Sequence, residues 1–405
     1  MKTNFSLTAI TIALLAFQGQ SHAQQMPHPP YAGYGGPMAF SQPVAFPPQT
    51  GYPGAQPIAY GYSMQEAAAQ GGGAAECQDC GTASGCSCDE CSASACDQCC
   101  CDPCCCGPKW FAFGDYLYMR ARDAEVAYAV PIDGPVAQPD DPKFQIGPTA
   151  VADFDYESAF RAGFGVGLGN MMSVGVAYTS FDTDTSSSTS TVPGNLIHTL
   201  VSHRQTDTAS QQFLSAAADY SMDFDLVDVD FRRVVSCGCG HQITCLLGAR
   251  YAGLQQDFVA DFVAPNNEEI VTTDVHFDGG GIRLGLDAEW YGCNRRCFVY
   301  GRSAASFVAG EFKASYRQDD LFGQDVIYTD WQAGRIVTML DLEVGIGLSS
   351  RNGRVRASVG YMISGWFNTV NTDEFIKAVA VTGDFTGLNN SMSFDGAVAR
   401  AEIRF

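Results

Sequence analysis

Apolar and polar residues alternate with a period of two along much of the second half of the chain. In Phe160–Leu168, alternate positions are apolar, and the positions between them carry Arg161 and glycines. The segments 282–290, 340–348 and 355–363 repeat this pattern, with charges and glycines on one face. A period of two predicts β-strands with one face in an apolar and the other in a polar environment. A soluble sandwich also alternates, but it seldom repeats so many glycines on its polar face.

Turn signals divide these patterns into ten strands, with long connections alternating strictly with short ones. Such alternation is typical of an outer-membrane β-barrel, which has short periplasmic turns and long external loops. We therefore predict an all-β fold, a single antiparallel transmembrane β-barrel over residues 108–405. The fourth and seventh strands are long enough to be broken pairs, so twelve strands is the alternative. The strands are expected near 110–121, 158–168, 171–181, 209–235, 243–258, 274–290, 297–317, 334–350, 354–369 and 392–405, and the long connections near 122–157, 182–208, 259–273, 318–333 and 370–391.

The part of the chain before the barrel lacks this alternation. Residues 1–23 have a basic start, a short apolar run and the end Ser21-His22-Ala23, which predicts a cleaved secretory signal peptide. Residues 24–76 are rich in Pro, Gly and Tyr and predict a disordered spacer. No run of 18 apolar residues follows the signal. The exported chain would therefore cross a bilayer only as a closed barrel.

Charge and histidine content narrow the function. Loss of Lys2 with the signal changes the formal charge from −21 to −22, which disfavours nucleic acid as a partner. The six histidines lie in no recognisable catalytic spacing. We therefore expect no enzyme and no cofactor.

Cysteine is concentrated in residues 77–107, which hold 12 of the 17 cysteines. This segment has few hydrophobic residues to form a core, so cross-links or metal must organise it. Consecutive Cys-x-x-Cys pairs suit a soft metal, but an exported chain favours oxidation. We expect disulfides, some of them to other envelope proteins, and no metal, with the pairing open. The candidates are Cys77, Cys80, Cys88, Cys91, Cys96, Cys99, Cys101, Cys104, Cys237, Cys239, Cys245, Cys293 and Cys297.

Charged residues on the glycine-bearing face form a second candidate site. Barrels of about eight strands have interiors that side chains fill, and ten strands are not much wider. These charges therefore either form a salt-bridge network that fills the lumen or line a narrow, ion-selective pore. The predicted lumen-facing charges are Arg161, Arg250, Arg283, Asp287, Glu289, Asp341, Glu343, Arg356, Arg400 and Glu402.

The last strand ends its alternation on Phe405, an aromatic residue at the terminus. This ending resembles the assembly signal of bacterial outer-membrane barrels, which implies the barrel assembly machinery as a partner. Further short motifs follow one another in a characteristic order, among them Trp110 with Tyr116-Leu117-Tyr118, Phe160-Arg161-Ala162-Gly163-Phe164-Gly165-Val166, Gly248-Ala249-Arg250-Tyr251, Gly279-Gly280-Gly281-Ile282-Arg283-Leu284-Gly285 and Leu342-Glu343-Val344-Gly345. With them, residues 110–405 resemble the pore-forming proteins of the Legionella major outer membrane protein family, in a form like those of planctomycetes.

The resemblance implies an outer-membrane location and a pore-like role. We therefore expect porin-like passive diffusion of small solutes or ions, with outer-membrane lipid as a partner. The alternative is a structural envelope protein, anchored by the barrel and disulfide-cross-linked through its Cys-rich segment. An even number of strands places both barrel ends, and with them every cysteine, in the periplasm.

Overall fold

The computed structural model describes residues 109–134, 144–169, 171–191, 194–204, 213–238, 240–265, 267–292, 296–320 and 325–405. The predicted signal peptide, the spacer 24–76 and the Cys-rich segment 77–107 lie outside these residues. Within the described part, no helix is long and apolar enough to cross a membrane.

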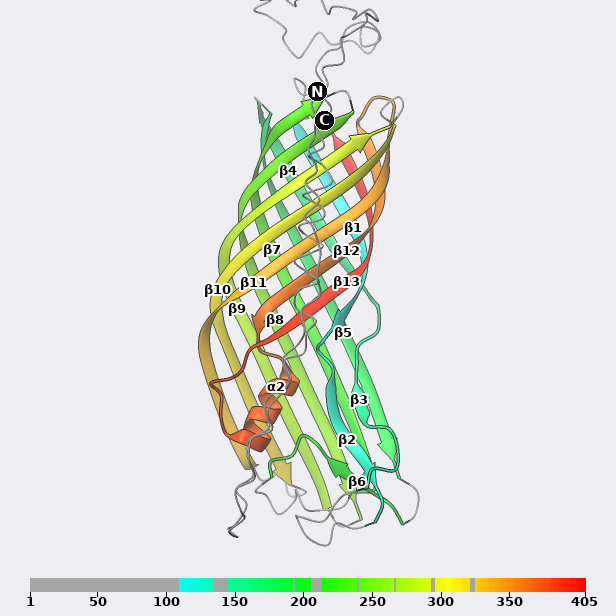
Figure 1. Ribbon diagram of the computed structural model, residues 1–405, viewed down its shortest axis with the longest axis vertical. Coiled ribbons are helices and arrows are strands. Elements are labelled where there is room, and N and C mark those ends of the chain that lie inside the picture. The colour runs from blue at the N-terminus through cyan, green and yellow to red at the C-terminus, as the bar shows by residue number, and fades with distance from the viewer. Residues whose placement is uncertain are drawn as a thin grey trace, which may run out of the picture. The chain divides into compact units, whose positions relative to one another are not determined.

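Ten antiparallel strands form a closed barrel (Figure 1). The barrel closes where the last strand pairs with the first, for example at Tyr116 and Ala399, and the Lys109 N–H donates to the Phe405 carbonyl at 2.7 Å. The count of ten is confirmed and the alternative of twelve is wrong, because the fourth and seventh strands are continuous. The strands are β1 (Trp110–Arg122), β4 (Glu157–Gly169), β5 (Met172–Ser190), β7 (Ser215–Gly238), β8 (His241–Ala264), β9 (Asn267–Tyr291), β10 (Cys297–Asp320), β11 (Asp325–Ser349), β12 (Val355–Thr369) and β13 (Asn390–Arg404).

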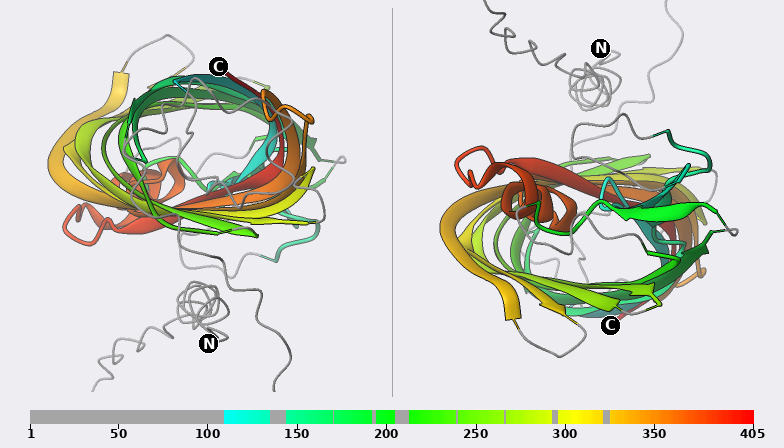
Figure 2. Two further views of the ribbon diagram at one scale, coloured as in Figure 1. Left: turned by 90° about the horizontal axis from the view of Figure 1, so that it is seen from above. Right: turned by 90° about the horizontal axis from the view of Figure 1, so that it is seen from below.

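The two ends of the barrel differ in their connections. The end that holds Trp110 and Phe405 has only short turns, and we call the adjacent part of the barrel the rim half. The opposite end carries a three-stranded sheet of β2 (Val126–Ile132), β3 (Ala150–Ala152) and β6 (Leu196–Thr199), together with helix α2 (Thr372–Lys377) and the π-helix η3 (Ala378–Thr382). We call this part the cap half. Figure 2 shows these cap segments gathered at one mouth of the barrel.

Two predicted long loops are strands. The connections expected at 259–273 and 318–333 are instead the continuations of the β8–β9 and β10–β11 hairpins. Alternation persists through these regions, but the apolar residues point inward: Ala260, Phe262 and Val271 are buried while Asp261 and Thr272 are less so. A search for strands with apolar outward faces therefore ends too early.

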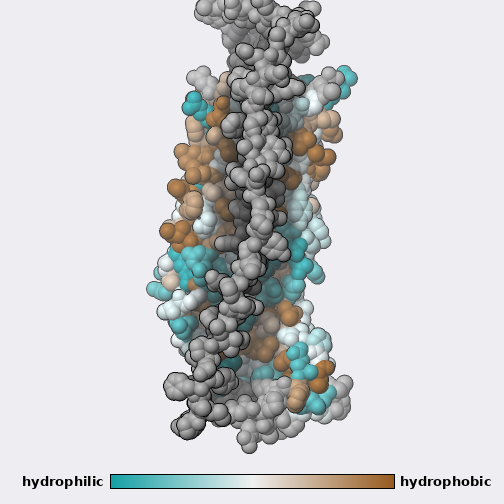
Figure 3. All heavy atoms as spheres, in the orientation of Figure 1, coloured by the Kyte–Doolittle hydropathy of each residue, from teal (hydrophilic) through white to brown (hydrophobic). Residues whose placement is uncertain are grey.

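The barrel wall reverses the polarity of its two faces between its halves. On β7, inward Tyr220, Met222 and Phe224 are buried in the cap half, and inward Asp228 and Asp230 are buried in the rim half. The outward face changes in the opposite sense, from Asp219 and Asp223 to Val229 and Phe231. Figure 3 shows hydrophobic residues gathered on the upper part of the wall, toward the rim end, and hydrophilic ones further down. The rim half thus suits a lipid environment and the cap half suits water.

The change occurs along one row of paired residues across five strands. This boundary row consists of outward Asp225, Gly253, Asp278, Glu311 and Gly334. On its rim side the outward residues are apolar and exposed, including Ile282, Phe307 and Ile336.

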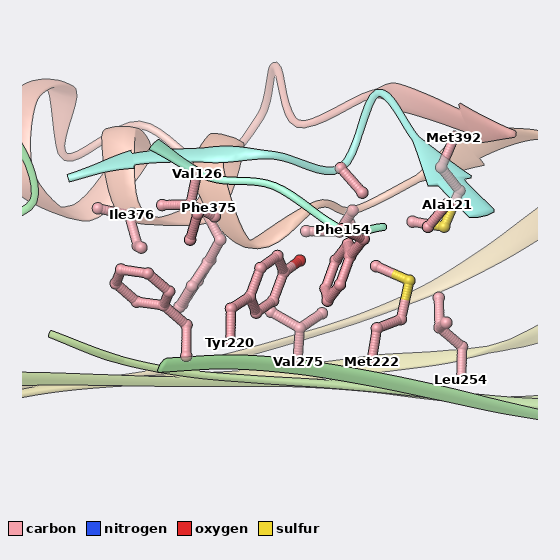
Figure 4. Close-up of a cluster of buried hydrophobic side chains, with 14 of the residues drawn as sticks. Ala121, Val126, Phe154, Tyr220, Met222, Leu254, Val275, Phe375, Ile376 and Met392 are labelled. Atoms are coloured by element: carbon pink, nitrogen blue, oxygen red, sulfur yellow. The ribbon is translucent and has the colours of Figure 1, made fainter. Parts of the chain in front are cut away.

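The interior of the cap half is a hydrophobic core. Barrel residues such as Tyr220 and Val275 pack against Val126 of β2, Phe154 after β3, and Phe375 of α2, as Figure 4 shows. Deeper in the barrel, the Phe394 ring contacts Phe181, Phe224 and Trp366 with centroids 5.9, 4.8 and 5.3 Å away. Apolar side chains therefore fill the mouth of the barrel at the cap end.

Truncation of Phe394 tests this core. We expect Phe394→Ala to lower the free energy of unfolding by about 3–5 kcal/mol, because it leaves a cavity among three aromatic rings. Urea unfolding of the detergent-refolded barrel, followed by tryptophan fluorescence, measures the change. The control is Phe307→Ala, whose outward ring is 45% exposed, and whose loss detergent or lipid fills. Equal losses in the two variants would contradict the assignment of the core.

Candidate functional site

The lumen of the rim half is the candidate site, because charged side chains from most strands converge there. The structure places all ten predicted lumen-facing charges on inward positions, and each lies within 4.0 Å of an oppositely charged group. The arginines are Arg161, Arg232, Arg250, Arg283, Arg302, Arg356, Arg400 and Arg404; the carboxylates are Asp115, Asp228, Asp230, Asp287, Glu289, Asp341, Glu343 and Glu402. The two sets are equal in number, so the lumen carries no formal net charge.

A first cluster is centred on Asp115, whose side chain is fully buried. It accepts from Arg161 Nε at 2.6 Å and from Arg400 Nε and Nη2 at 2.6 and 2.7 Å. Arg161 also donates to Glu343 at 2.6 Å, and Arg302 donates to Glu343 at 2.8 Å. Because Arg161 lies on β4 and Glu343 on β11, which are not neighbours in the barrel, this bridge crosses the lumen.

A second cluster lies nearer the hydrophobic core. Arg250 donates to Asp228 at 2.6 and 2.9 Å and to Asp341 at 2.8 Å, and Arg283 also pairs with Asp228. Ser364 donates to Asp341 at 2.6 Å. Arg250 of β8 and Asp341 of β11 are again separated by intervening strands, so this cluster also spans the interior.

Further ion pairs complete the network. Glu289 accepts from Arg356 at 2.8 Å, and Glu402 pairs with Arg404. Arg232 lies 3.4 Å from Asp230 and 3.7 Å from Asp287. Every carboxylate in the lumen thus has a cationic neighbour, as burial of charge requires.

Inward glycines make room for aromatic rings from the neighbouring strand. Phe111 pairs with Gly165 across β1 and β4, and a Cβ on Gly165 would lie 2.2 Å from the Phe111 ring. Phe298 covers Gly347 in the same way across β10 and β11. Arg356 stacks over the Phe298 ring at 4.0 Å, so the rings also support the arginines. The glycines are therefore part of the packing that narrows the lumen.

Little space is left between these groups. A cavity of about 80 Å³ lies among Arg161, Asp228, Arg250 and Glu343, which is room for a few water molecules. The ion pairs that cross the lumen and the hydrophobic core beyond them therefore obstruct the interior of the described barrel.

The sequence reading overlooked Asp115, the centre of the first cluster, and the inward rings of Phe111 and Phe298. Alternation in β1 contains the signal for Asp115, since Tyr116 and Tyr118 on either side of Leu117 face outward. No comparable signal marks the rings, because an aromatic residue fits both the lipid face and a glycine-lined lumen.

Cysteine is described at three positions, all near the rim end. Cys237 at the end of β7 is disulfide-bonded, whereas Cys245 and Cys297 are free thiols on β8 and β10. Cys245 pairs with Leu286 across β8 and β9. The other candidate cysteines, Cys239, Cys293 and those of 77–107, lie outside the described residues. Among described residues, no group of three or more His, Cys, Asp or Glu side chains is placed to hold a metal ion.

Comparison with known proteins matches most of the chain to a family of outer membrane proteins. The family model described as Legionella pneumophila major outer membrane protein precursor matches residues 103–402. The outer membrane protease OmpT from Escherichia coli has 8% identity and a TM-score of 0.43 over 73% of this chain and 96% of its own. The Pseudomonas putida toluene transporter TodX has 7% identity and a TM-score of 0.25 over 74% and 90%, and a Pseudomonas aeruginosa FadL homologue 9% and 0.21 over 73% and 90%. No curated protein sequence matches the chain.

Removal of the Asp115 charge tests the energetic role of the network. Asp115→Asn leaves Arg161 and Arg400 without their shared carboxylate, so we expect a loss of about 3–5 kcal/mol in unfolding free energy. Urea titration in detergent micelles measures it. The control is Asp319→Asn, whose partner Arg317 is half exposed on the outer wall, with an expected loss of less than about 1 kcal/mol. A loss at Asp115 as small as the control's would mean that the lumen charges are not a structural network.

Proposed function

The chain belongs to the Legionella major outer membrane protein family, and from this premise we propose that it is a porin-like barrel held in a closed state. In this proposal, small solutes or ions diffuse passively through the charge-lined rim half once the hydrophobic plug of the cap half moves aside. The proposal rests on one observation: the polar lumen of the rim half ends at the hydrophobic core of the cap half, which acts as an apolar plug.

The two parts of the interior would affect a permeating solute differently: the rim half by its polarity, and the plug by its obstruction of the path. The paired charges of the rim half are polar and neutral in sum, which favours small hydrated solutes without strong preference for either sign of ion. The plug is this hydrophobic core, in which inward side chains of the barrel wall pack against connections between strands, namely β2, β3 and α2. Connections move at a lower cost than barrel strands, since their displacement breaks no strand pairing of the barrel.

The proposal places the rim end in the periplasm and the cap half outside the cell. Short turns at the rim end and elaborated connections at the cap end support this direction. Pairing of Lys109 with Phe405 puts both ends of the barrel at the rim. The Cys-rich segment, which directly precedes β1 in sequence, would then lie in the periplasm.

Conductance in planar bilayers tests the closed-pore proposal. We expect rare, small openings from the unaltered protein. Replacement of residues 372–389 by a short Gly/Ser linker removes α2 and η3 and should increase the time spent open. Addition of Arg161→Ala and Glu343→Ala, which removes one bridge across the lumen, should increase the conductance severalfold.

The control for these variants is Arg317→Ala with Asp319→Ala, which removes an ion pair on the outer wall and should leave the recordings unchanged. Heat-modifiable electrophoretic mobility checks that each variant is folded. The pore proposal would be wrong if a folded variant that lacks residues 372–389 and the Arg161–Glu343 bridge showed no channel events.

A second candidate is a structural envelope protein with the barrel as its anchor. Ion pairs that cross the lumen favour it, because they stabilise a barrel that need not open. In this role the Cys-rich segment would cross-link the protein to neighbours. Non-reducing electrophoresis of envelopes should then show high-molecular-weight species that collapse to the monomer on reduction. A monomer under both conditions would remove this candidate.

A further inference from the structure

The barrel wall of the cap half is incomplete at one place. β11 pairs with β10 along its whole length, but with β12 only from Thr338 onward. The chain leaves β12 at Thr369 and forms α2 and η3 before it returns as β13. Residues 325–337 of β11 therefore have no strand partner on the β12 side in the described part of the chain. Figure 1 shows α2 beside these long strands, where the wall would otherwise continue.

A groove of about 720 Å³ opens at this place, between β11 and the segment that follows η3. Its lining includes Gly310, Gly334, Arg335, Ile336, Asn368 and Leu388. The volume lies within the range of small-molecule sites, about 300–1,000 Å³. Gly334 belongs to the boundary row, so the groove lies where the outer wall changes from apolar to polar.

Arg335 is the charged group of this groove, and its charge is not neutralised by a close carboxylate. Its guanidinium lies 5.5 Å from the centre of the Trp331 ring and donates to Asn368 Oδ1 at 3.3 Å. Asn368 Nδ2 in turn donates to the Ile336 carbonyl at 2.9 Å, which fixes the amide beside the arginine. No Asp or Glu of the described residues lies within ion-pair distance of Arg335, whereas every arginine of the lumen network has one.

Two carboxylates lie in the neighbourhood of Arg335, and neither is within ion-pair distance of it. Glu311 pairs with Gly334 across β10 and β11 and lies 3.4 Å from Lys313, and Glu374 of α2 accepts a hydrogen bond from the Asn389 N–H at 2.8 Å. Next to the groove on the rim side, the outward residues Phe307 and Ile336 are apolar and about half exposed. The groove thus combines one available cation with an apolar surface that faces the lipid.

We propose that this groove binds a membrane amphiphile with a phosphate headgroup. The phosphate is held by Arg335 and by the second amide N–H of Asn368, and the chains lie along Ile336 and Phe307. Charge-assisted hydrogen bonds of this kind are the strong ones, and a site half removed from water strengthens them further. The site lies in the wall and not in the lumen, so it is independent of whether the barrel conducts.

Native mass spectrometry of the full-length barrel in a non-ionic detergent tests the site, with dihexanoyl phosphatidic acid as the probe. We expect saturable binding of one equivalent. Arg335→Gln should weaken it at least about tenfold, since a hydrogen bond to a charged group is worth about 1.5–3 kcal/mol. Gly334→Phe should weaken it similarly by filling the groove. A Cβ at Gly334 meets only the Gly310 carbonyl, at 3.9 Å, so the larger residue is tolerated.

Three comparisons make the result decisive. Arg317→Gln, which changes an outer-wall arginine outside the groove, should bind as the unaltered protein does. Dihexanoylglycerol, which lacks the phosphate, should bind at least tenfold more weakly, and equal binding would overturn headgroup recognition. Inorganic phosphate that displaces the probe at equal concentration would overturn the amphiphile in favour of a soluble anion. Unchanged affinity in both Arg335→Gln and Gly334→Phe would overturn the site itself.

Discussion

A β-barrel wall that crosses a lipid bilayer and then continues into water must exchange the polarity of its two faces. The strands β7 to β11 do so without interruption, because the period of two is kept while the apolar residues change from one alternate set of positions to the other. The exchange determines what fills the interior on each side of the boundary row. Charges that face inward beside lipid must pair with one another, and apolar residues that face inward beside water must pack against a core.

The paired charges and the hydrophobic core therefore have one origin, and together they close the barrel. A lumen filled by arginine and carboxylate pairs gains rigidity, because loss of either partner leaves a buried charge unpaired. The core depends on β2, β3 and α2, which cover an inward surface that would otherwise expose Tyr220 and its neighbours to water. Any solute path must disturb both parts, but only the core includes segments that lie outside the barrel wall. This asymmetry is why we place the gate at the cap end.

The sequence was sufficient for the parts of the fold in which apolar residues face outward and polar residues face inward throughout a strand. Alternation located all ten strands and put residues such as Arg161, Arg250 and Glu343 on the inward face. It was insufficient where the rule reverses: the ends of β8 to β11 were predicted as loops because their apolar residues, such as Val271, point inward. Pairings across the lumen, such as Arg161 with Glu343, depend on barrel diameter and on which strands oppose each other. Neither quantity is encoded in the period of a single strand.

The groove in the barrel wall exists because β11 is longer than its neighbour β12. The alternation of apolar and polar residues does not predict this difference in length. β11 continues twelve residues and more beyond the last pairing with β12, and a free edge of this kind exposes backbone groups that other chains could pair with. The protein manages the edge locally: the Asn368 side chain caps the Ile336 carbonyl, and Trp331 packs toward Phe375 of α2. The same devices orient Arg335 toward a gap in the wall. An arginine used only to cover the edge would gain most from a carboxylate partner, yet no Asp or Glu of the described residues lies within ion-pair distance of Arg335, whereas the arginines of the lumen network have one. Its neighbours are instead the Asn368 amide and the Trp331 ring, and this difference is the reason to look for an anion that the chain itself does not provide.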